Sequence, residues 1–379
     1  MTAPAIKPIA NPLAATRRLV VKIGSALLVG EGGEIHRAWL DSLCDDLAEA
    51  RARGVEVVVV TSGAIAIGRR HLKLPGKALR LDEKQAAAAT GQIRLAHAWQ
   101  ETLARHDITV AQVLLTIDDT ENRRRWVNAR STMETLVRLG AIPVINENDT
   151  VATQEIRFGD NDRLAARVAQ MIAADTLVLF SDIDGLYTAD PRRHADAAFI
   201  AEVREITPEI EASAGDPSSG VGSGGMITKI QAARIALAAG CRMAVAPGAP
   251  LHPLRAITRG GRCTWFLPGQ EPLTARKQWI AGAVATQGTL VVDQGARRAL
   301  AKGGSLLPAG VKSVEGEFQK GDTVLVKDEA GQAVARGLAA YSAEDARIII
   351  GRKSGDFEIL LGYRGRDELI HRDDLVLEP

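Results

Sequence analysis

The sequence predicts an α/β fold, in which an open, mostly parallel sheet is sandwiched by helices, followed by a small, mostly β domain. Short β-branched runs alternate with longer helical patterns from residue 17 to about residue 268. One run, "VEVVVVTSG", contains an unbroken apolar stretch, as expected of a strand buried on both faces. From about residue 277 the pattern changes to brief strands separated by glycine-rich turns.

The elements of the first domain follow in order. "RLVVKIG" is the first strand, and the helix after it begins at about His36 with three leucines on one face. The strand "VEVVVVTSG" and the alanine-rich helical sequence around "AAAATGQIRLAHAW" come next. Further strands are "ITVAQVLLT", "AIPVINEN", "TLVLFSDI" and "CRMAVAPG". The stretch "RGGRCTWFLPGQEPLTARK" carries the last strand and then a linker, which gives domains at 17–268 and 277–377.

The second domain is expected to hold one short helix and then brief strands. Its turns include "KGD" and "EAG", and the strands are predicted to continue to "ARIIIG".

Composition excludes several classes of protein. The chain has 379 residues, 46% of them hydrophobic and 25% charged, which suffices for a substantial core. A net charge of +1 gives no general basic field for nucleic acid. Cys44, Cys241 and Cys263 form neither a disulfide framework nor a metal pair, as is typical of a reducing compartment. No signal peptide or membrane span is predicted, so we expect a cytoplasmic location.

Polar or small residues follow several strands of the predicted sheet. They are Gly24-Ser25, Ser62-Gly63, Asn146-Glu147-Asn148-Asp149 and Ser181-Asp182. Since ligands of parallel sheets bind beyond the carboxyl ends of the strands, we expect the functional site there.

Lys22 and Ser62 each have a structural and a functional interpretation. Lys22 could be an edge-strand lysine before a turn, but on a buried strand its charge needs a partner. Gly24 beside it leaves backbone amides accessible to an anion. Ser62 could be the N-cap of the helix "AIAIGRR", which the sequence alone favours, or the start of that helix could bind an anion.

The stretch "INENDTVATQEIRFGDNDRLAARVAQ" is the most polar in the first domain. Asp160-Asn161-Asp162 begins the next helix, and capping accounts for only one residue of so many. Carboxylates and amides at this density suit an amino acid, whose ammonium needs an anion and whose carboxylate needs donors. Asp162 could also hold lysines in their charged form. Mg²⁺ binding is a competing role for the carboxylates.

The glycine-rich segment "SGVGSGGMITKIQAARIALAAG" fits neither the P-loop nor the dinucleotide-binding pattern. Its helix is expected to bury Ile227, Ile230, Ala233 and Leu237, with Lys229 off that stripe. An exposed lysine is one interpretation, but a cation in a first turn opposes the helix dipole unless an anion binds there. Two lysines, two glycine-containing loops and an acidic loop together indicate phosphoryl transfer.

These motifs resemble the amino acid kinase family. The similarity rests on "VVKIGSALL", "VTSGAIAIG", "INENDTV", "FGDND", "SDIDGLYTADP" and "GSGGMITKIQAA", which occur in order along the chain. Within the family they are most similar to the members that phosphorylate the γ-carboxylate of L-glutamate, the first step of proline synthesis. The C-terminal sequence "GGSLLPAGVKSVEGEFQKGD" resembles a PUA domain.

The resemblance implies a role for each motif. Lys22 would contact the phosphates of ATP, Lys229 would stabilise the transferring phosphoryl group, Asp162 would position both lysines, and Asp160 would be catalytic or linked to the substrate. The nucleotide would be bound by Lys22, Gly24, Ser181, Asp182, Ser223, Gly224, Gly225, Met226, Ile227, Thr228 and Lys229. Glutamate would be bound by Ser62, Gly63, Asn146, Asp149 and Asn161.

The resemblance also implies ATP and Mg²⁺ as cofactors, with no protein ligand assigned to the metal. Proline would be a feedback inhibitor and the chain a homo-oligomer. The acyl phosphate would pass to a separate reductase, because no room is left for a fused one. Rival acceptors within the family are acetylglutamate, aspartate, carbamate and a nucleoside monophosphate. RNA binding by the PUA-like domain is a rival of another class, disfavoured by its interleaved acidic residues.

Overall fold

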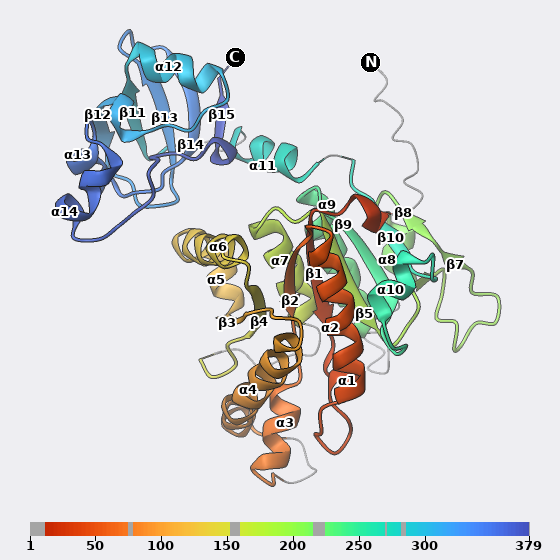
Figure 1. Cartoon of the computed structure of the whole chain (residues 1–379). Coiled ribbons are helices and arrows are strands. Elements are labelled where there is room, and N and C mark those ends of the chain that lie inside the picture. Colours follow the sequence, from red (N-terminus) through yellow and green to blue (C-terminus); the bar gives the residue numbers. More distant parts are fainter. Residues whose placement is uncertain are drawn as a thin grey trace. The chain divides into compact units, whose positions relative to one another are not determined.

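The computed structural model describes residues 12–74, 79–151, 160–214, 224–269, 271–281 and 286–378. They form two compact units (Figure 1). The first contains the described residues up to Thr120 and those of Arg130–Pro272, and the second contains Glu121–Ala129 and Leu273 onwards. Within the described residues, no helix is long and apolar enough to cross a membrane.

The first unit is built on an eight-stranded sheet in the order β3-β4-β2-β1-β5-β9-β10-β8. The strands are β1 (Arg18–Ile23), β2 (Glu56–Val60), β3 (Val110–Leu115), β4 (Ile142–Glu147), β5 (Thr176–Ser181), β8 (Glu202–Val203), β9 (Arg242–Pro247) and β10 (Thr264–Phe266). All neighbouring pairs are parallel except β9 with β10. The predicted strands and their mostly parallel arrangement are therefore confirmed. The short strands β6 (Leu186–Tyr187) and β7 (Phe199–Ile200) form a separate hairpin ladder.

Helices cover both faces of this sheet, as predicted (Figure 1). The helices described between Ser25 and Thr258 are α1 (Ser25–Leu28), α2 (Arg37–Ala52), α3 (Ala64–His71), α4 (Leu81–Ala104), α5 (Ile117–Glu121), α6 (Arg123–Arg138), α7 (Asp160–Met171), α8 (Pro208–Ser213), α9 (Gly224–Ala238) and α10 (Pro253–Thr258). Leucines of α2 and residues of α4 share one core cluster with Val21, Val59 and Val178. Helices α7 and α9 contact each other, and α7 contacts β1 and β5. Because strand side chains alternate between faces, Val20 and Lys22 lie on the face opposite Val21.

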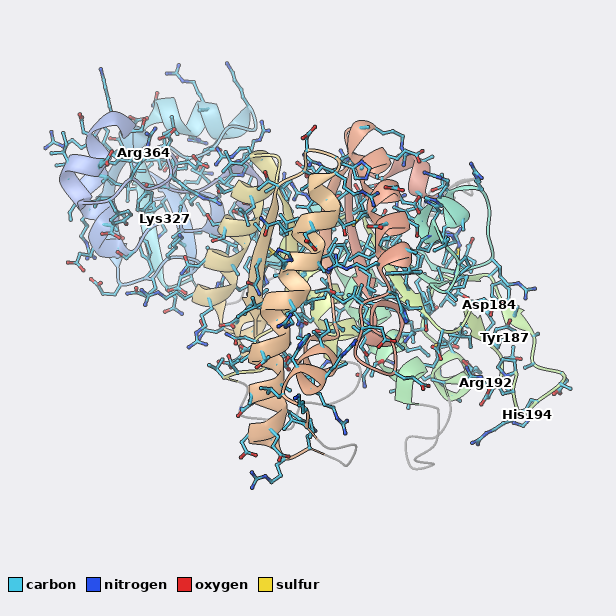
Figure 2. All side chains as sticks on the ribbon, turned by 60° about the horizontal axis from the view of Figure 1, so that its bottom comes forward. Asp184, Tyr187, Arg192, His194, Lys327 and Arg364 are labelled. Carbon is cyan, nitrogen blue, oxygen red and sulfur yellow. The ribbon has the colours of Figure 1, made fainter. Side chains whose placement is uncertain are left out.

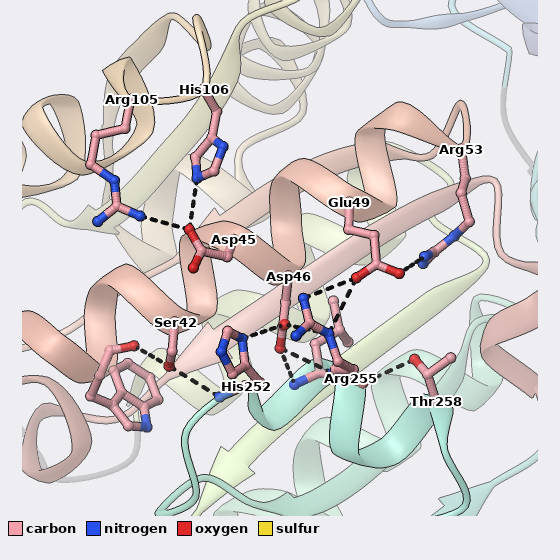
Figure 3. A network of polar contacts seen from close by, with 12 residues as sticks. Ser42, Asp45, Asp46, Glu49, Arg53, Arg105, His106, His252, Arg255 and Thr258 are labelled. Atoms are coloured by element: carbon pink, nitrogen blue, oxygen red, sulfur yellow. Dashed lines mark hydrogen bonds and ion pairs between the residues drawn. The ribbon is translucent and has the colours of Figure 1, made fainter.

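A buried carboxylate joins α2 to α10 (Figure 3). Asp46 accepts hydrogen bonds from the backbone amides of Leu254 and Arg255, both at 3.0 Å, and its other oxygen lies 3.0 Å from Nδ1 of His252. It thereby caps α10 from a different helix, which satisfies two of the unpaired amides of that terminus. This contact fixes the segment that follows β9.

The second unit holds a five-stranded sheet in the order β12-β11-β13-β14-β15. The elements from α11 onwards are α11 (Pro272–Ala281), β11 (Gly288–Val292), α12 (Gln294–Ala301), β12 (Val311–Gly316), β13 (Thr323–Asp328), β14 (Ala333–Leu338), α13 (Ala343–Ile349), α14 (Phe357–Leu361) and β15 (Leu375–Leu377). The short helix and the brief strands are confirmed. The prediction of strand continuing to "ARIIIG" is wrong, because α13 forms there. Ser342 caps that helix by accepting from the amide of Asp345, and two acidic residues occupy its first turn.

Candidate functional site

Lys22 lies on a central strand of the sheet. Its strand β1 pairs with β2 on one side and β5 on the other, so the interpretation as an edge-strand lysine is wrong. The residue is only 8% exposed. Its alternation with Val21 directs it to the face covered by α7, where it needs a counter-charge.

Asp162 supplies that charge from the first turn of α7. Its Oδ1 lies 2.6 Å from Nζ of Lys22, and its Oδ2 lies 3.3 Å from Nζ of Lys229. The hydroxyl of Thr228 donates to the same Oδ2 at 2.8 Å. One buried carboxylate therefore holds two ammonium groups that come from β1 and α9, as the sequence predicted for Asp162.

Lys229 is buried, which excludes the interpretation as an exposed lysine. Its Nζ donates to the carbonyl oxygen of Gly225 at 3.0 Å, one turn back along α9. The expected core stripe is wrong in part, since Ile227 and Leu237 are only half-buried. The buried residues of this helix include Lys229, Ile230, Ala232, Ala233 and Ala236. The hydrophobic pattern failed here because the ion pair with Asp162 brings the lysine inward.

This cluster carries a net positive charge. Burial lowers the pKa of Lys22, and repulsion by Lys229 adds to this, while the carboxylate of Asp162 opposes both. Burial alone would raise the pKa of Asp162, but the two ammonium groups outweigh it and hold the pKa below its ordinary value. The two lysines share one buried carboxylate, and the exposed carboxylate of Asp182 also interacts with both of them. The excess positive charge of the buried contact lies next to the amino-terminal turn of α9, whose dipole adds to the attraction for an anion.

Gly24 lies beside the ammonium group of Lys22. A Cβ atom built on it would lie 3.7 Å from Nζ of Lys22, and its backbone is extended where α1 begins. The structure thus brings Gly24, Lys22, Asp162, Gly225, Thr228 and Lys229 together, and Met226 and Ile227 are half-buried on the same turn of α9.

A second cluster consists of side-chain amides at the ends of β2 and β4. The amide nitrogen of Asn161, on α7, donates to Oγ of Ser62 at 2.6 Å and lies 3.3 Å from the carbonyl oxygen of Thr61. It also lies 3.4 Å from Oδ1 of Asn146, which is 2% exposed. Three of the residues predicted to bind glutamate are therefore neighbours.

Ser62 is not a helix cap, although the sequence alone favoured that interpretation. The N-cap position of α3 is occupied by Gly63, and no side chain caps this end of the helix. Gly63 has φ +108°, and a Cβ atom there would lie 2.7 Å from Cγ2 of Val29. Only glycine fits this turn, which frees the hydroxyl of Ser62 for the contact with Asn161.

Asp149 follows β4 and is buried, at 7% exposure. One feature of the amide cluster itself favours a ligand there. Oδ1 of Asn161 is buried and finds no hydrogen-bond partner among the described residues. A buried acceptor without a donor is costly, so its presence favours a ligand that brings a donor.

Ser181 is the last residue of β5, at the same edge of the sheet, and Asp182 follows it. The hydroxyl of Ser181 donates to Oδ1 of Asp182 at 3.0 Å. Partial burial would raise the pKa of the Asp182 carboxyl, but this hydrogen bond and other favourable interactions hold that pKa below its ordinary value. The Asp182 side chain is exposed and lies 3.5 Å from Nη2 of Arg192. Arg192 belongs to the segment after β5, on which Figure 2 also labels Asp184 and Tyr187.

Some predicted residues cannot be placed. Ser223 and the side chain of Asp160 lie outside the described residues, and of Gly224 only its position at the start of α9 is given. Within the described ranges, no group of three or more His, Cys, Asp or Glu side chains is arranged to hold a metal ion.

Sequence reasoning missed three residues that support the amide cluster. Oε1 of Gln92, on α4, accepts from the amide nitrogen of Asn146 at 2.7 Å. Nε1 of Trp99 lies 3.3 Å from Oγ1 of Thr61. A signal was present, because Gln92 and Trp99 are seven residues apart and fall on the buried stripe of an alanine-rich helix.

The fold and the site define an α/β protein with a positively charged cluster, suited to an anion, at the carboxyl edge of a mostly parallel sheet. Two buried ammonium groups and a helix amino terminus face the same place, and an amide-rich cluster lies on the neighbouring strands.

The chain belongs to the amino acid kinase family, whose sequence profile matches residues 17–247. The PUA domain profile matches residues 288–360. Glutamate 5-kinase of Paramagnetospirillum magneticum is 69% identical over 369 residues, which cover 97% of this chain and all of that protein. Glutamate 5-kinase of Rhodospirillum rubrum is 62% identical and covers 95% of this chain and 96% of its own length. That of Agrobacterium fabrum is 57% identical, with 97% and 94% covered.

Proposed function

We propose that this protein transfers the γ-phosphoryl group of ATP to the side-chain carboxylate of L-glutamate, giving L-glutamyl 5-phosphate for proline synthesis. The observation that carries the proposal is the pair of buried ammonium groups held by Asp162, next to the amide cluster. Relatives named glutamate 5-kinase, identical at up to 69% of positions over nearly the whole chain, support the same reaction.

The phosphates of ATP fit the positively charged cluster. Lys22 and the backbone amide beside it at Gly24 would contact them, and Lys229 would stabilise the phosphoryl group as it moves. The stretch from Ser223 to Lys229 and the pair Ser181-Asp182 would bind the nucleotide. Both oxygens of Asp162 are engaged by lysines and Thr228, which favours a positioning role over metal ligation. Bound with the nucleotide, Mg²⁺ would neutralise further phosphate charge.

The amide cluster suits free glutamate. Asp149 would pair with the ammonium group, Oδ1 of Asn161 would accept from it, and Ser62, Gly63 and Asn146 would complete the glutamate site. Described residues of the cluster are acids, amides and a hydroxyl, which suits an amino acid better than a phosphorylated acceptor. Asp160 stays a predicted contributor.

The reaction needs no base to generate its nucleophile. The γ-carboxylate of glutamate is ionised at pH 7, since the ordinary pKa of this group is about 4.3. One of its oxygens attacks the γ-phosphorus, and the bond from that phosphorus to the bridging oxygen of ADP breaks. The barrier comes from bringing an anion to a polyanion, so the lysines contribute by offsetting the repulsion and by stabilising the redistributed charge.

Three partner relationships belong to the same proposal. Proline would inhibit the first step of its own synthesis, the chain would form a homo-oligomer, and the acyl phosphate would pass to a separate reductase.

The test is ADP release from Mg-ATP against a panel of glutamate, aspartate, acetylglutamate, carbamate and UMP, with hydroxylamine present. Glutamate-dependent ADP with an equal amount of γ-glutamyl hydroxamate, suppressed by proline, is expected. Turnover with another acceptor and none with glutamate would overturn the assignment of glutamate as the substrate. No turnover with any acceptor would overturn the proposed kinase activity.

A further inference from the structure

Three side-chain amides form a chain whose direction is fixed at one end. The carbonyl oxygen of Thr61 can only accept, so Asn161 presents its NH₂ group there. That nitrogen also faces Asn146, which must therefore present Oδ1 to it and direct its own NH₂ group away. The NH₂ group of Asn146 meets Gln92 at 2.7 Å, so Gln92 has to present Oε1. The orientation of each amide follows from that of its neighbour.

We infer that Gln92 is a positioning residue for the acceptor substrate, acting through Asn146 on Asn161. By accepting from Asn146, it holds the amides in the one orientation that leaves Oδ1 of Asn161 as the unpaired acceptor. That oxygen is suited to the ammonium group of the amino acid. The inference rests on the proposed function and adds the residue that sets the polarity of its glutamate site.

Gln92 is held rigidly enough for this role. It is 9% exposed, and its neighbour Gly91 lies against α3 so closely that a Cβ atom would sit 1.8 Å from the carbonyl oxygen of Ala64. Trp99, two turns further along α4, reaches Thr61 at the other end of the amide chain. Helix α4 thus contacts the ends of both β2 and β4 through one face.

Two substitutions of Gln92 separate the polarity of its amide from its bulk. Gln92→Met removes the acceptor at similar volume, so the amide of Asn146 loses its partner and can rotate. Gln92→Glu keeps an acceptor and abolishes the donor. Gln100→Met makes the same chemical change at an exposed position of the same helix and is the matched control.

The experiment compares L-glutamate with glutarate, which lacks the ammonium group, as acceptors in the full-length chain. For Gln92→Met we expect kcat/KM for glutamate to fall by about tenfold, as for the loss of a buried hydrogen-bond partner, mainly through the glutamate KM. The KM for ATP and the kcat/KM for glutarate should change little, so the preference for glutamate falls. Gln92→Glu and Gln100→Met should keep the preference.

Several outcomes would overturn the inference. They are an unchanged preference in Gln92→Met, an equal loss on both acceptors, and a loss of preference in Gln92→Glu. The last outcome would show that an acceptor at residue 92 does not maintain the preference, and this comparison remains available if Gln92→Met does not fold. Failure of the unsubstituted chain to use glutamate would instead overturn the proposed function, so the two failures are distinguishable.

Discussion

At the scale of residues, the chemistry depends on how one carboxylate is shared. Asp162 is 1% exposed and engages Lys22 and Lys229 through different oxygens. A buried ion pair gains little net stability, because desolvation costs about as much as the attraction returns. Two lysines around one acid are therefore better explained by a ligand that brings the missing negative charge.

Replacement of Lys229 tests its contact with the moving phosphoryl group. Lys229→Met keeps the volume and removes the charge, so kcat should fall by about 10²–10³, the usual effect of losing one donor to transition-state charge. Steady-state kinetics should show only a modest change in the glutamate KM. Lys302→Met, at an exposed position, is the control. Near-normal turnover of Lys229→Met would refute its role.

Replacement of Asp162 should change the pH dependence. The pKa of Lys22 already lies below its ordinary value because of burial, and Asp162 is the main group that raises it. Since Lys22 must be protonated to hold phosphate, kcat/KM for ATP should decline as pH rises through this pKa. In Asp162→Asn the opposing charge is lost, the pKa falls further, and the alkaline decline should begin at lower pH.

The pH profiles of the unsubstituted chain, Asp162→Asn and a control at an exposed position, Asp196→Asn, provide the comparison. An alkaline decline at the same pH in all three would contradict the coupling between Asp162 and Lys22.

The sequence could predict which residues matter here better than how they interact. Strand-end position and the nearby glycines were enough to single out Lys22 and Lys229. The hydrogen-bond partner of Ser62 could not be predicted from local sequence, because Ser62 and Asn161 are 99 positions apart. Local capping preferences favoured a different interpretation, and the positive φ of Gly63 decided against it.

At the scale of elements, α3 and α4 cross at unusually short range. A Cβ atom on Gly68 would lie 1.8 Å from the carbonyl oxygen of Ala87, and one on Gly91 would lie 1.8 Å from that of Ala64. The atoms that a Cβ would clash with are backbone carbonyl oxygens, which can move only if a whole helix shifts. This crossing fixes α4, and with it Gln92, relative to the turn at Gly63.

Gly91→Ala should therefore force the helices apart. We expect a loss of about 2 kcal/mol in the free energy of unfolding, in the range typical of overpacking, together with a raised glutamate KM. Gly269→Ala is the matched control, because a Cβ atom there meets no atom within 4 Å. Calorimetry and kinetics on both variants provide the measurement. Equal stability of the two variants would contradict the close crossing.

Strands were predicted more reliably than short helices. The buried strands are rich in β-branched and apolar residues, as in the valines of β1 and β2, so the sequence identifies them readily as strands. Brief strands were expected up to "ARIIIG", but the cap at Ser342 and the acidic first turn favour a helix there, and α13 forms. The strand preference of the two isoleucines at the end of α13 is smaller than the stabilisation that the N-cap and the acidic first turn give the helix.

At the scale of the whole molecule, the sequence foresaw two folded parts and the PUA-like character of the second. It held no signal that Glu121–Ala129 would group with the second unit. The segment Glu121–Ala129 contacts the rest of this unit through the hydrogen bond from Nη2 of Arg123 to Oγ1 of Thr323, at 2.6 Å. It joins residues 200 positions apart, and local periodicity carries no information on such pairs.

The central claim is that a carboxylate oxygen of glutamate attacks the γ-phosphorus of ATP. It is tested most directly with glutamate carrying ¹⁸O in its side-chain carboxylate, with hydroxylamine present to cleave the acyl phosphate at carbon. The phosphate released should then contain one ¹⁸O, measured by mass spectrometry, and should match the hydroxamate formed. Unlabelled phosphate would mean that water attacked ATP instead, and would contradict the account.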